Sequence, residues 1–515
     1  MKLFSSRKNI VLGVVFSYIS LAISLIGAFF ITPVILRNIG DRNYGLFSFC
    51  NSITSWLSII SVSLGASYVF FASKEKKEHD SESTTNTIFS KLLFLLSGIV
   101  ALLTVFALAI LYFSGFRFAN YSSDENTIIF LLLLISSLNV SITIFFSGFI
   151  LYNNYTKSFA FVRGVQIIVS LGSYATNLIL AMTTKSIIPI AIVSFLSAFF
   201  TGLVNMFYSL RAKKMTFNKS EKLKKNKQLL KLISKYSSII LISTIITNLD
   251  SNLDKTLLGF MVNAESVTMY QLSINFATHL LVLSFSFTEV MRPTFFGMYR
   301  NEQIDAANDL FLKICKMQSV VVFLIVGGYI ACGYHFVIMW IGTERIDVYY
   351  YSVALFVSNI VPLTKSMDGE AQKATNHHKT PMFFSIIGII INLGLSISLI
   401  VILPKEYAVW ACIIGTIVPR FIFGCVVTPI YNSKVIKLPM SKYYSDILKM
   451  FLITYCAVVP SIRLTSLLSD YEIHNAIKVL IEGLTFVFIY GFGVYLLNKK
   501  TVLDIINTYF RRKSA

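Results

Sequence analysis

Charged residues are scarce in this chain. They make up 14% of its 515 residues, against roughly 25% in an ordinary soluble domain. Acidic residues are the scarcer sign, with 25 Asp and Glu against 45 Lys and Arg. The six cysteines have no CxxC spacing, so the sequence indicates neither a zinc site nor a disulfide framework. The polar stretches are also too short to form separate soluble domains. These absences exclude a chain of soluble domains.

Long apolar blocks fill the sequence instead, and 55% of all residues are hydrophobic. About 20 apolar residues span the hydrocarbon core of a bilayer as a helix, which satisfies its own backbone polar groups. The sequence therefore predicts an all-α polytopic membrane protein with about 14 transmembrane helices. We place them at about 10–36, 46–71, 88–113, 127–151, 159–182, 187–210, 236–260, 265–291, 314–338, 347–371, 381–403, 407–431, 445–468 and 476–497.

The basic residues between these blocks indicate the orientation. They gather in alternate loops, as Lys and Arg do on the cytoplasmic side of membrane proteins. The other set of loops contains only Arg37, Arg42, Arg117, Lys185, Arg345 and Lys405. This pattern predicts that both termini are cytoplasmic. It also explains the net charge of +20 without nucleic acid. We interpret the basic stretch 211–235 as a solvated hinge, although such a loop could also bind acidic lipid headgroups.

This hinge divides the chain almost in half, and weak matches relate the two sides. Tyr44 aligns with Tyr270, and Lys157 with Lys379, at nearly constant offset. Six helices on each side predict two pseudo-symmetric bundles of the same orientation. The predicted organisation is therefore a six-helix bundle at 1–210, the hinge at 211–235, a second six-helix bundle at 236–431, and two extra helices with a cytoplasmic tail at 432–515.

Polar side chains in the predicted seventh helix mark a candidate site. At 100° per residue, Asp250 and Asp254 share one face, while Asn248, Asn252 and Lys255 share the opposite face. Such residues are expensive in a bilayer and usually face a cavity or a partner. We expect the amides to line a polar cavity and either carboxylate to bind a coupling ion, H⁺ or Na⁺. A purely structural pairing of Asp254 with Lys255 stays open. The sequence predicts no metal site and no cofactor.

Cations recur in five other predicted helices. We interpret them, together with Lys255, as a positively lined passage for an anionic headgroup, with Ser358 as a further polar lining residue. The alternative for each is a salt bridge, as for Lys365 with Asp368 or Lys478 with Glu482, or snorkelling at a helix end. The five residues are Arg163, Lys365, Arg420, Arg463 and Lys478.

Several segments, taken in order, resemble one family of membrane proteins. They are ILRNIGDRNYGLFSF at 35–49, LDKTLLGFMVNAESVTMYQLSINFA at 253–277, FVIMWIG at 336–342, DGEAQKATNHHKTP at 368–381 and IINLGLSISLIVILPKEYAVWACIIGTIV at 390–418. Over its full length the chain resembles the O-antigen (Wzx-type) polysaccharide flippases of the multidrug/oligosaccharidyl-lipid/polysaccharide (MOP) exporter superfamily. The resemblance implies a MATE-like fold.

The resemblance also implies a function. Such flippases move an undecaprenyl-diphosphate-linked oligosaccharide, an O-antigen or capsule repeat unit, from the cytoplasmic to the periplasmic leaflet of the bacterial inner membrane. Alternating access coupled to an ion would drive the movement, and polymerase and chain-length proteins of the same pathway would be partners. No enzyme activity is implied.

Two other functions stay open at this stage. A multidrug antiporter of the same superfamily would favour an acidic cavity, whereas the bases within the predicted helices outnumber the acids. A membrane O-antigen polymerase or glycosyltransferase would need a large outer loop or a catalytic acid pair, and the sequence contains no such constellation.

Overall fold

The computed structural model describes residues 2–79, 82–218, 227–467 and 474–510. These residues form helices and contain no strand. Thirteen helical segments within them are long and apolar enough to cross a membrane, close to the predicted number. The chain is therefore a multi-pass membrane protein, as predicted. Residues 219–226 of the predicted hinge lie outside the described residues.

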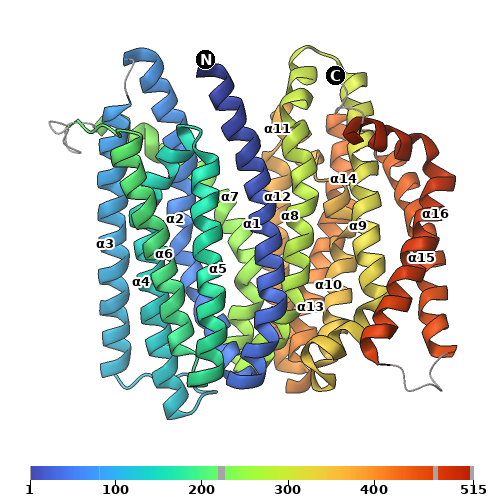
Figure 1. The fold of residues 1–515 in the computed structure, drawn as a ribbon, viewed down its shortest axis with the longest axis horizontal. Helices are drawn as coiled ribbons and strands as arrows, with labels where there is room; N and C mark the ends of the chain where they lie inside the picture. Colours follow the sequence, from blue (N-terminus) through green and yellow to red (C-terminus); the bar gives the residue numbers. More distant parts are fainter. Residues whose placement is uncertain (1, 80–81, 219–226, 468–473, 511–515) are drawn as a thin grey trace. The chain divides into compact units, whose positions relative to one another are not determined.

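The helices divide into two compact units, residues 1–268 and 269–515. The first contains α1 (Lys2–Ile39), α2 (Asp41–His79), α3 (Ser83–Phe113), α4 (Ser123–Tyr155), α5 (Phe159–Thr184), α6 (Ile188–Phe207), the π-helix η1 (Tyr208–Ala212) and α7 (Lys227–Met261). Figure 1 shows α3, α4, α5 and α6 as long, roughly parallel helices. Helix α8 (Ala264–Arg300) begins in the first unit and continues into the second.

The second unit continues with α9 (Ile304–Ile341), η3 (Thr343–Arg345), α10 (Asp347–Thr364), α11 (Asp368–Ala374), α12 (Lys379–Ile402), η4 (Lys405–Tyr407), α13 (Ala408–Pro419), the π-helix η5 (Arg420–Val427), α14 (Thr428–Tyr431), the π-helix η6 (Asn432–Ile436), α15 (Met440–Leu467) and α16 (Asn475–Phe510). The predicted tenth helix is thus interrupted between Thr364 and Asp368, and the predicted twelfth changes its hydrogen-bond pattern at Arg420. Proline explains the second change, because Pro419 has no N–H to continue the ladder.

Helix α7 packs along α2 within the first unit. The compact units thus divide the chain after α7, whereas the predicted bundles divide it before this helix. The predicted internal repeat, which rests on sequence offsets, stays a prediction.

Close helix contacts depend on small residues at defined positions. A side chain on Gly45 of α2 would collide with the Ala264 carbonyl at the start of α8, since its Cβ would lie 1.8 Å from that oxygen. In the second unit, a Cβ on Gly327 of α9 would meet Thr454 and Phe486 at 2.5 and 2.7 Å. Glycine therefore sets the helix spacing at both places.

Candidate functional site

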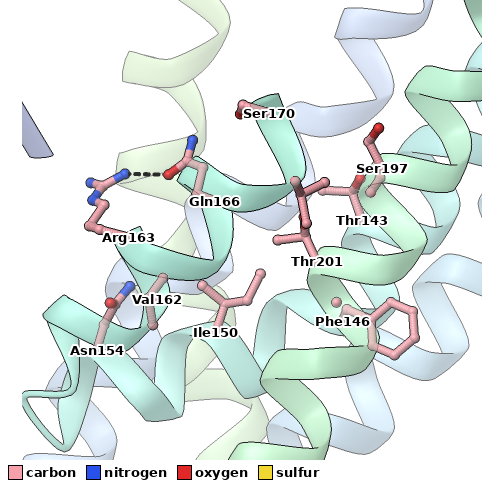
Figure 2. Close-up of a pocket in the computed structure, with 13 residues that line it drawn as sticks. Thr143, Phe146, Ile150, Asn154, Val162, Arg163, Gln166, Ser170, Ser197 and Thr201 are labelled. Atoms are coloured by element: carbon pink, nitrogen blue, oxygen red, sulfur yellow. Dashed lines mark hydrogen bonds between the residues drawn. The ribbon is translucent and has the colours of Figure 1, made fainter. Parts of the chain in front are cut away.

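A groove between α4, α5 and α6 holds the first of the predicted cations. Its volume is about 380 Å³, within the range of small-molecule sites. Figure 2 shows Arg163 and Gln166 on successive turns of α5, with the Arg163 Nη1 donating to Gln166 Oε1 over 2.9 Å. Arg163 is exposed. Among the residues that the structure describes, no carboxylate pairs with it.

The rest of the groove offers neutral polar groups beside apolar ones. Hydroxyl and amide side chains line it from three helices, whereas Phe146, Ile150 and Val162 supply its apolar wall (Figure 2). This arrangement combines one cation, several hydrogen-bonding groups and an apolar surface, which suits an amphiphile with an anionic, hydroxylated head. The polar lining residues are Thr143, Asn154, Gln166, Ser170, Ser197 and Thr201.

The polar face of α7 contacts α2. The Ser55 Oγ donates to Asn248 Oδ1 over 3.2 Å, and the Asn252 Nδ2 donates to the same oxygen over 3.2 Å. About one helical turn away, the Ser52 and Thr256 hydroxyls are 3.0 Å apart. Asn248, predicted to line a cavity, therefore joins α7 to α2, and Asn252, predicted for the same role, bonds to it within α7.

The two α7 carboxylates lie in different environments. Asp250 is exposed, whereas Asp254 is 2% exposed. Lys255, the neighbour of Asp254, is half-buried. The two candidates for ion binding, which share one helical face in the sequence, thus differ in their exposure in the structure.

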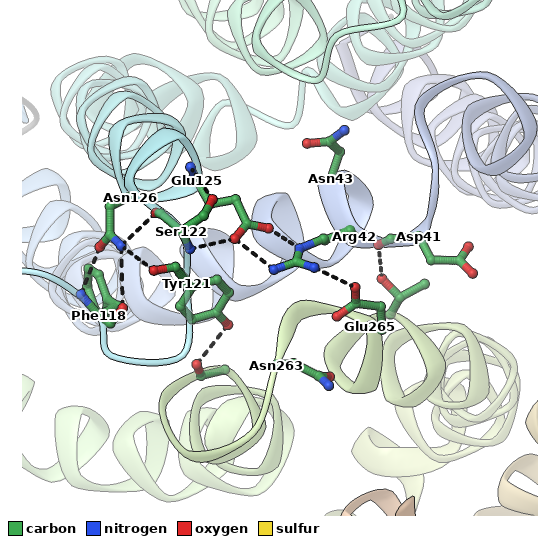
Figure 3. A network of polar contacts seen from close by, with 12 residues as sticks. Asp41, Arg42, Asn43, Phe118, Tyr121, Ser122, Glu125, Asn126, Asn263 and Glu265 are labelled. Carbon is green, nitrogen blue, oxygen red and sulfur yellow. Dashed lines mark hydrogen bonds and ion pairs between the residues drawn. The ribbon is translucent and has the colours of Figure 1, made fainter. Parts of the chain in front are cut away.

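A network at one end of the first unit joins three helix ends (Figure 3). The Arg42 Nη2 donates to Glu125 Oε2 over 2.8 Å, and its Nε contacts the other carboxylate oxygen. Arg42 Nη1 also lies 3.6 Å from Glu265 Oε1. Ser122 and Glu125 form a capping box at the start of α4, which holds this carboxylate in place.

Further hydrogen bonds close the same end. The Tyr121 hydroxyl donates to the Gly259 carbonyl over 2.8 Å, and Thr268 Oγ1 donates to the Asp41 carbonyl over 2.6 Å. Sequence reasoning assigned Arg42 only to a sparse set of basic residues and missed the network. The spacing of Ser122 and Glu125 was the one local sign of it.

The second unit buries Lys365 in a network of its own. Its Nζ lies 2.5 Å from Asp368 Oδ2, and the two side chains are 6% and 11% exposed. Asn432 Nδ2 donates to the same carboxylate oxygen over 3.1 Å, and Gln372 Nε2 donates to Asn432 Oδ1 over 3.0 Å. The salt bridge considered from the sequence therefore exists. Through Asn432, the network connects the break between α10 and α11 to η6.

The other predicted residues of this unit lie on four different elements. Arg420 begins the π-helix η5. Arg463 is exposed near the end of α15. Lys478 lines a separate pocket with Glu482. Ser358 Oγ donates to the Leu355 carbonyl within its own helix.

Comparisons with solved structures identify the fold. The lipid II flippase MurJ in an inward-closed conformation matches with a TM-score of 0.73 and 14% identity, over 96% of this chain and 100% of that one. An inward-facing multidrug resistance MATE family transporter of the MOP superfamily matches with 0.62 and 11%, over 81% and 96%. A MOP superfamily transporter from Pyrococcus furiosus matches with 0.59 and 12%, over 84% and 97%. The predicted MATE-like fold is confirmed.

A family model covers more than half of the sequence. The model described as polysaccharide biosynthesis protein matches residues 11–299. No curated protein matches the chain. The solved structures that share this fold are described as a flippase and as transporters. The chain belongs to the polysaccharide biosynthesis protein family, which confirms the resemblance noted in its sequence.

Proposed function

We propose that this protein translocates an undecaprenyl-diphosphate-linked oligosaccharide, an O-antigen or capsule repeat unit, from the cytoplasmic to the periplasmic leaflet of a bacterial inner membrane. Family membership and a fold shared with a lipid II flippase support this class of substrate. Fold alone does not define a substrate. The observation that carries the proposal is the exposed Arg163 in a polar groove.

The groove chemistry fits such a substrate part by part. A guanidinium binds phosphate oxygens through two parallel N–H donors. Among the described residues, Arg163 bonds to the neutral Gln166 amide and pairs with no carboxylate. Sugar hydroxyls both donate and accept, as do the hydroxyls of Ser170, Ser197 and Thr201. The lipid part requires apolar surface, which Phe146 and Ile150 provide.

The proposed cycle needs no covalent chemistry. The substrate enters from the cytoplasmic leaflet, the protein alternates its access between the two faces, and the substrate leaves on the other side. H⁺ or Na⁺ resets the protein, with Asp250 or Asp254 as the binding carboxylate. The charge pattern of the loops supports cytoplasmic termini. Polymerase and chain-length proteins of the same pathway would take up the product.

A multidrug antiporter is the second candidate, because the fold also matches a multidrug resistance transporter and Asp250 is exposed. The two candidates differ at Arg163. A cation in the groove attracts a diphosphate and repels a cationic drug.

Complementation of a deletion strain tests the proposal. Wild-type protein and R163A are compared with R117A, a matched control in which an exposed arginine outside the groove is removed. We expect R163A to accumulate lipid-linked oligosaccharide on the cytoplasmic leaflet and to lose surface polysaccharide, while R117A behaves as wild type. Normal surface polysaccharide in the deletion strain, with no redundant flippase, would overturn the proposal. Drug sensitivity of that strain would favour the antiporter.

A further inference from the structure

A buried acid and a histidine contact each other in the second unit, and neither belongs to the Lys365 network. The His335 Nδ1 lies 3.0 and 3.1 Å from the two carboxylate oxygens of Glu482. The Glu482 side chain is 2% exposed and the His335 side chain 20%. The contact joins α9 to α16.

A pocket of about 340 Å³ gives this pair an opening. Its polar walls include Lys478, one turn before Glu482, together with Tyr334, Tyr349 and Ser466. A volume of this size, lined by several polar groups, holds water readily. The pair is therefore buried, yet it borders a space through which a proton can be exchanged.

A cluster of apolar side chains adjoins the pocket at Ala331. This buried cluster extends away from the pocket along α9, α15 and α16. It includes Phe323, Met450, Phe486 and Tyr490. The pocket itself lies near the ends of these helices, where α9 stops at Ile341 and α16 begins at Asn475. The predicted topology places these ends on the outer side. The pocket is therefore nearer to that side than to the other.

The other titratable groups near His335 come from α9, α10 and α16. Cys332 and Tyr334 lie on α9 itself, Tyr349 on α10 and Lys478 on α16. Helix α15 contributes the neutral residues Ile462 and Ser466 to the pocket, and its Arg463 is exposed outside the lining. In η3, the Arg345 Nη1 donates to the Ile341 carbonyl and Glu344 is exposed.

We propose that His335 and Glu482 form a proton-binding site that takes its proton from the face on which α9 and α15 end. The imidazole accepts the proton and becomes an imidazolium that donates to the carboxylate. The pair then changes from net negative to neutral beside the Lys478 ammonium. Histidine suits this role because it is the side chain that ordinarily changes charge near neutral pH. This site is separate from the α7 carboxylates, and it does not depend on the identity of the substrate.

Proton uptake by the purified full-length protein tests the site without any substrate. The protein, in weakly buffered detergent, is stepped from about pH 8 to about pH 5, the interval in which histidines usually titrate. We expect H335Q to take up about one proton per chain fewer than wild type. E482Q should change the pH dependence of the uptake, because the imidazolium loses its carboxylate. S466A, a pocket variant without a titrating group, should match wild type.

Two results would overturn the inference. Equal uptake by wild type and H335Q, and by H335N if H335Q does not fold, would show that His335 takes up no proton. Coincident uptake curves for wild type and E482Q would show that the carboxylate is not part of the site. Neither result would affect the proposed translocation, which is measured with substrate.

Discussion

Arg163 in the first unit and Lys365 in the second make an instructive pair. Each was predicted on the same ground, as a cation within an apolar helix. The structure leaves Arg163 exposed on a polar groove with an amide as neighbour. It buries Lys365 against Asp368 and adds Asn432 and Gln372 to the network.

The difference lies in the nearest carboxylate. A cation that already has a buried anion contributes to the fold, because its charge is compensated before any ligand arrives. A cation with only a neutral partner keeps its charge for a ligand. We therefore expect variants of the Lys365 network to lose stability first, and variants of Arg163 to lose function at unchanged stability.

The largest effect is expected for D368A. It leaves the Lys365 ammonium buried without its anion, and breaking such a pair typically costs about 3–5 kcal/mol in free energy of unfolding. Thermal unfolding of the purified protein in detergent measures it. R163A, the matched control from the other unit, should unfold at the wild-type temperature. Equal unfolding temperatures for D368A and wild type would contradict the assignment of Lys365 to the fold.

The double variant K365M/D368L sharpens the same comparison. Replacing both members of a buried ion pair by apolar residues is often neutral for stability. We expect it to recover most of the stability that D368A loses. If K365M/D368L is instead as unstable as D368A, the loss comes from packing and not from the uncompensated charge.

A smaller effect is expected in the network at the end of the first unit. E125A removes the Arg42 contacts and half of the capping box at the start of α4. We expect a loss of about 1–2 kcal/mol, as for other helix caps. Arg42 is 53% exposed, so R42A should lose less than E125A. Unfolding temperatures test this order, and a larger loss in R42A would contradict it.

The contact between α7 and α2 should matter less still. N248A removes an amide that bonds to Ser55 and Asn252. A neutral hydrogen bond contributes about 1 kcal/mol. Unfolding in detergent should show a loss of this order. No loss in N248A would free Asn248 for the cavity role that the sequence predicted.

The smallest effect is expected for the pair Lys449 and Asp446, whose nitrogen and oxygen are 3.1 Å apart and whose side chains are 56% and 30% exposed. Exposed ion pairs contribute about 0–1 kcal/mol. D446N should therefore lose the least stability of these variants, and it is the reference against which the loss in D368A is compared. A loss in D446N as large as in D368A would remove the distinction between buried and exposed pairs.

Much of the fold could be predicted because the apolar length of a spanning helix is a physical requirement of a bilayer. Helices were expected at nearly every place where the structure has one. The break between Thr364 and Asp368 was not predicted, because the polar residues at this place were interpreted as part of one continuous helix. The packing of α7 on α2 was also hidden, since hydropathy does not tell which partner a polar face meets.

The candidate site was harder to predict for a related reason. The sequence identified Arg163 and Lys365 but could not rank them, because only tertiary contacts show which cation has a carboxylate. The Lys365 pair with Asp368, three residues apart, was foreseen as an alternative. Arg42 with Glu125, and His335 with Glu482, are distant in sequence and gave no pattern to find.

Direct binding tests the central claim that Arg163 receives the anionic part of the substrate. The probe is undecaprenyl diphosphate, added to purified wild type, R163A and K365M/D368L, with binding measured by native mass spectrometry. A charge-assisted contact of about 1.5–3 kcal/mol predicts a loss of roughly 10- to 100-fold in affinity for R163A. The K365M/D368L variant should bind as wild type does. Equal affinity of R163A and wild type would contradict the account.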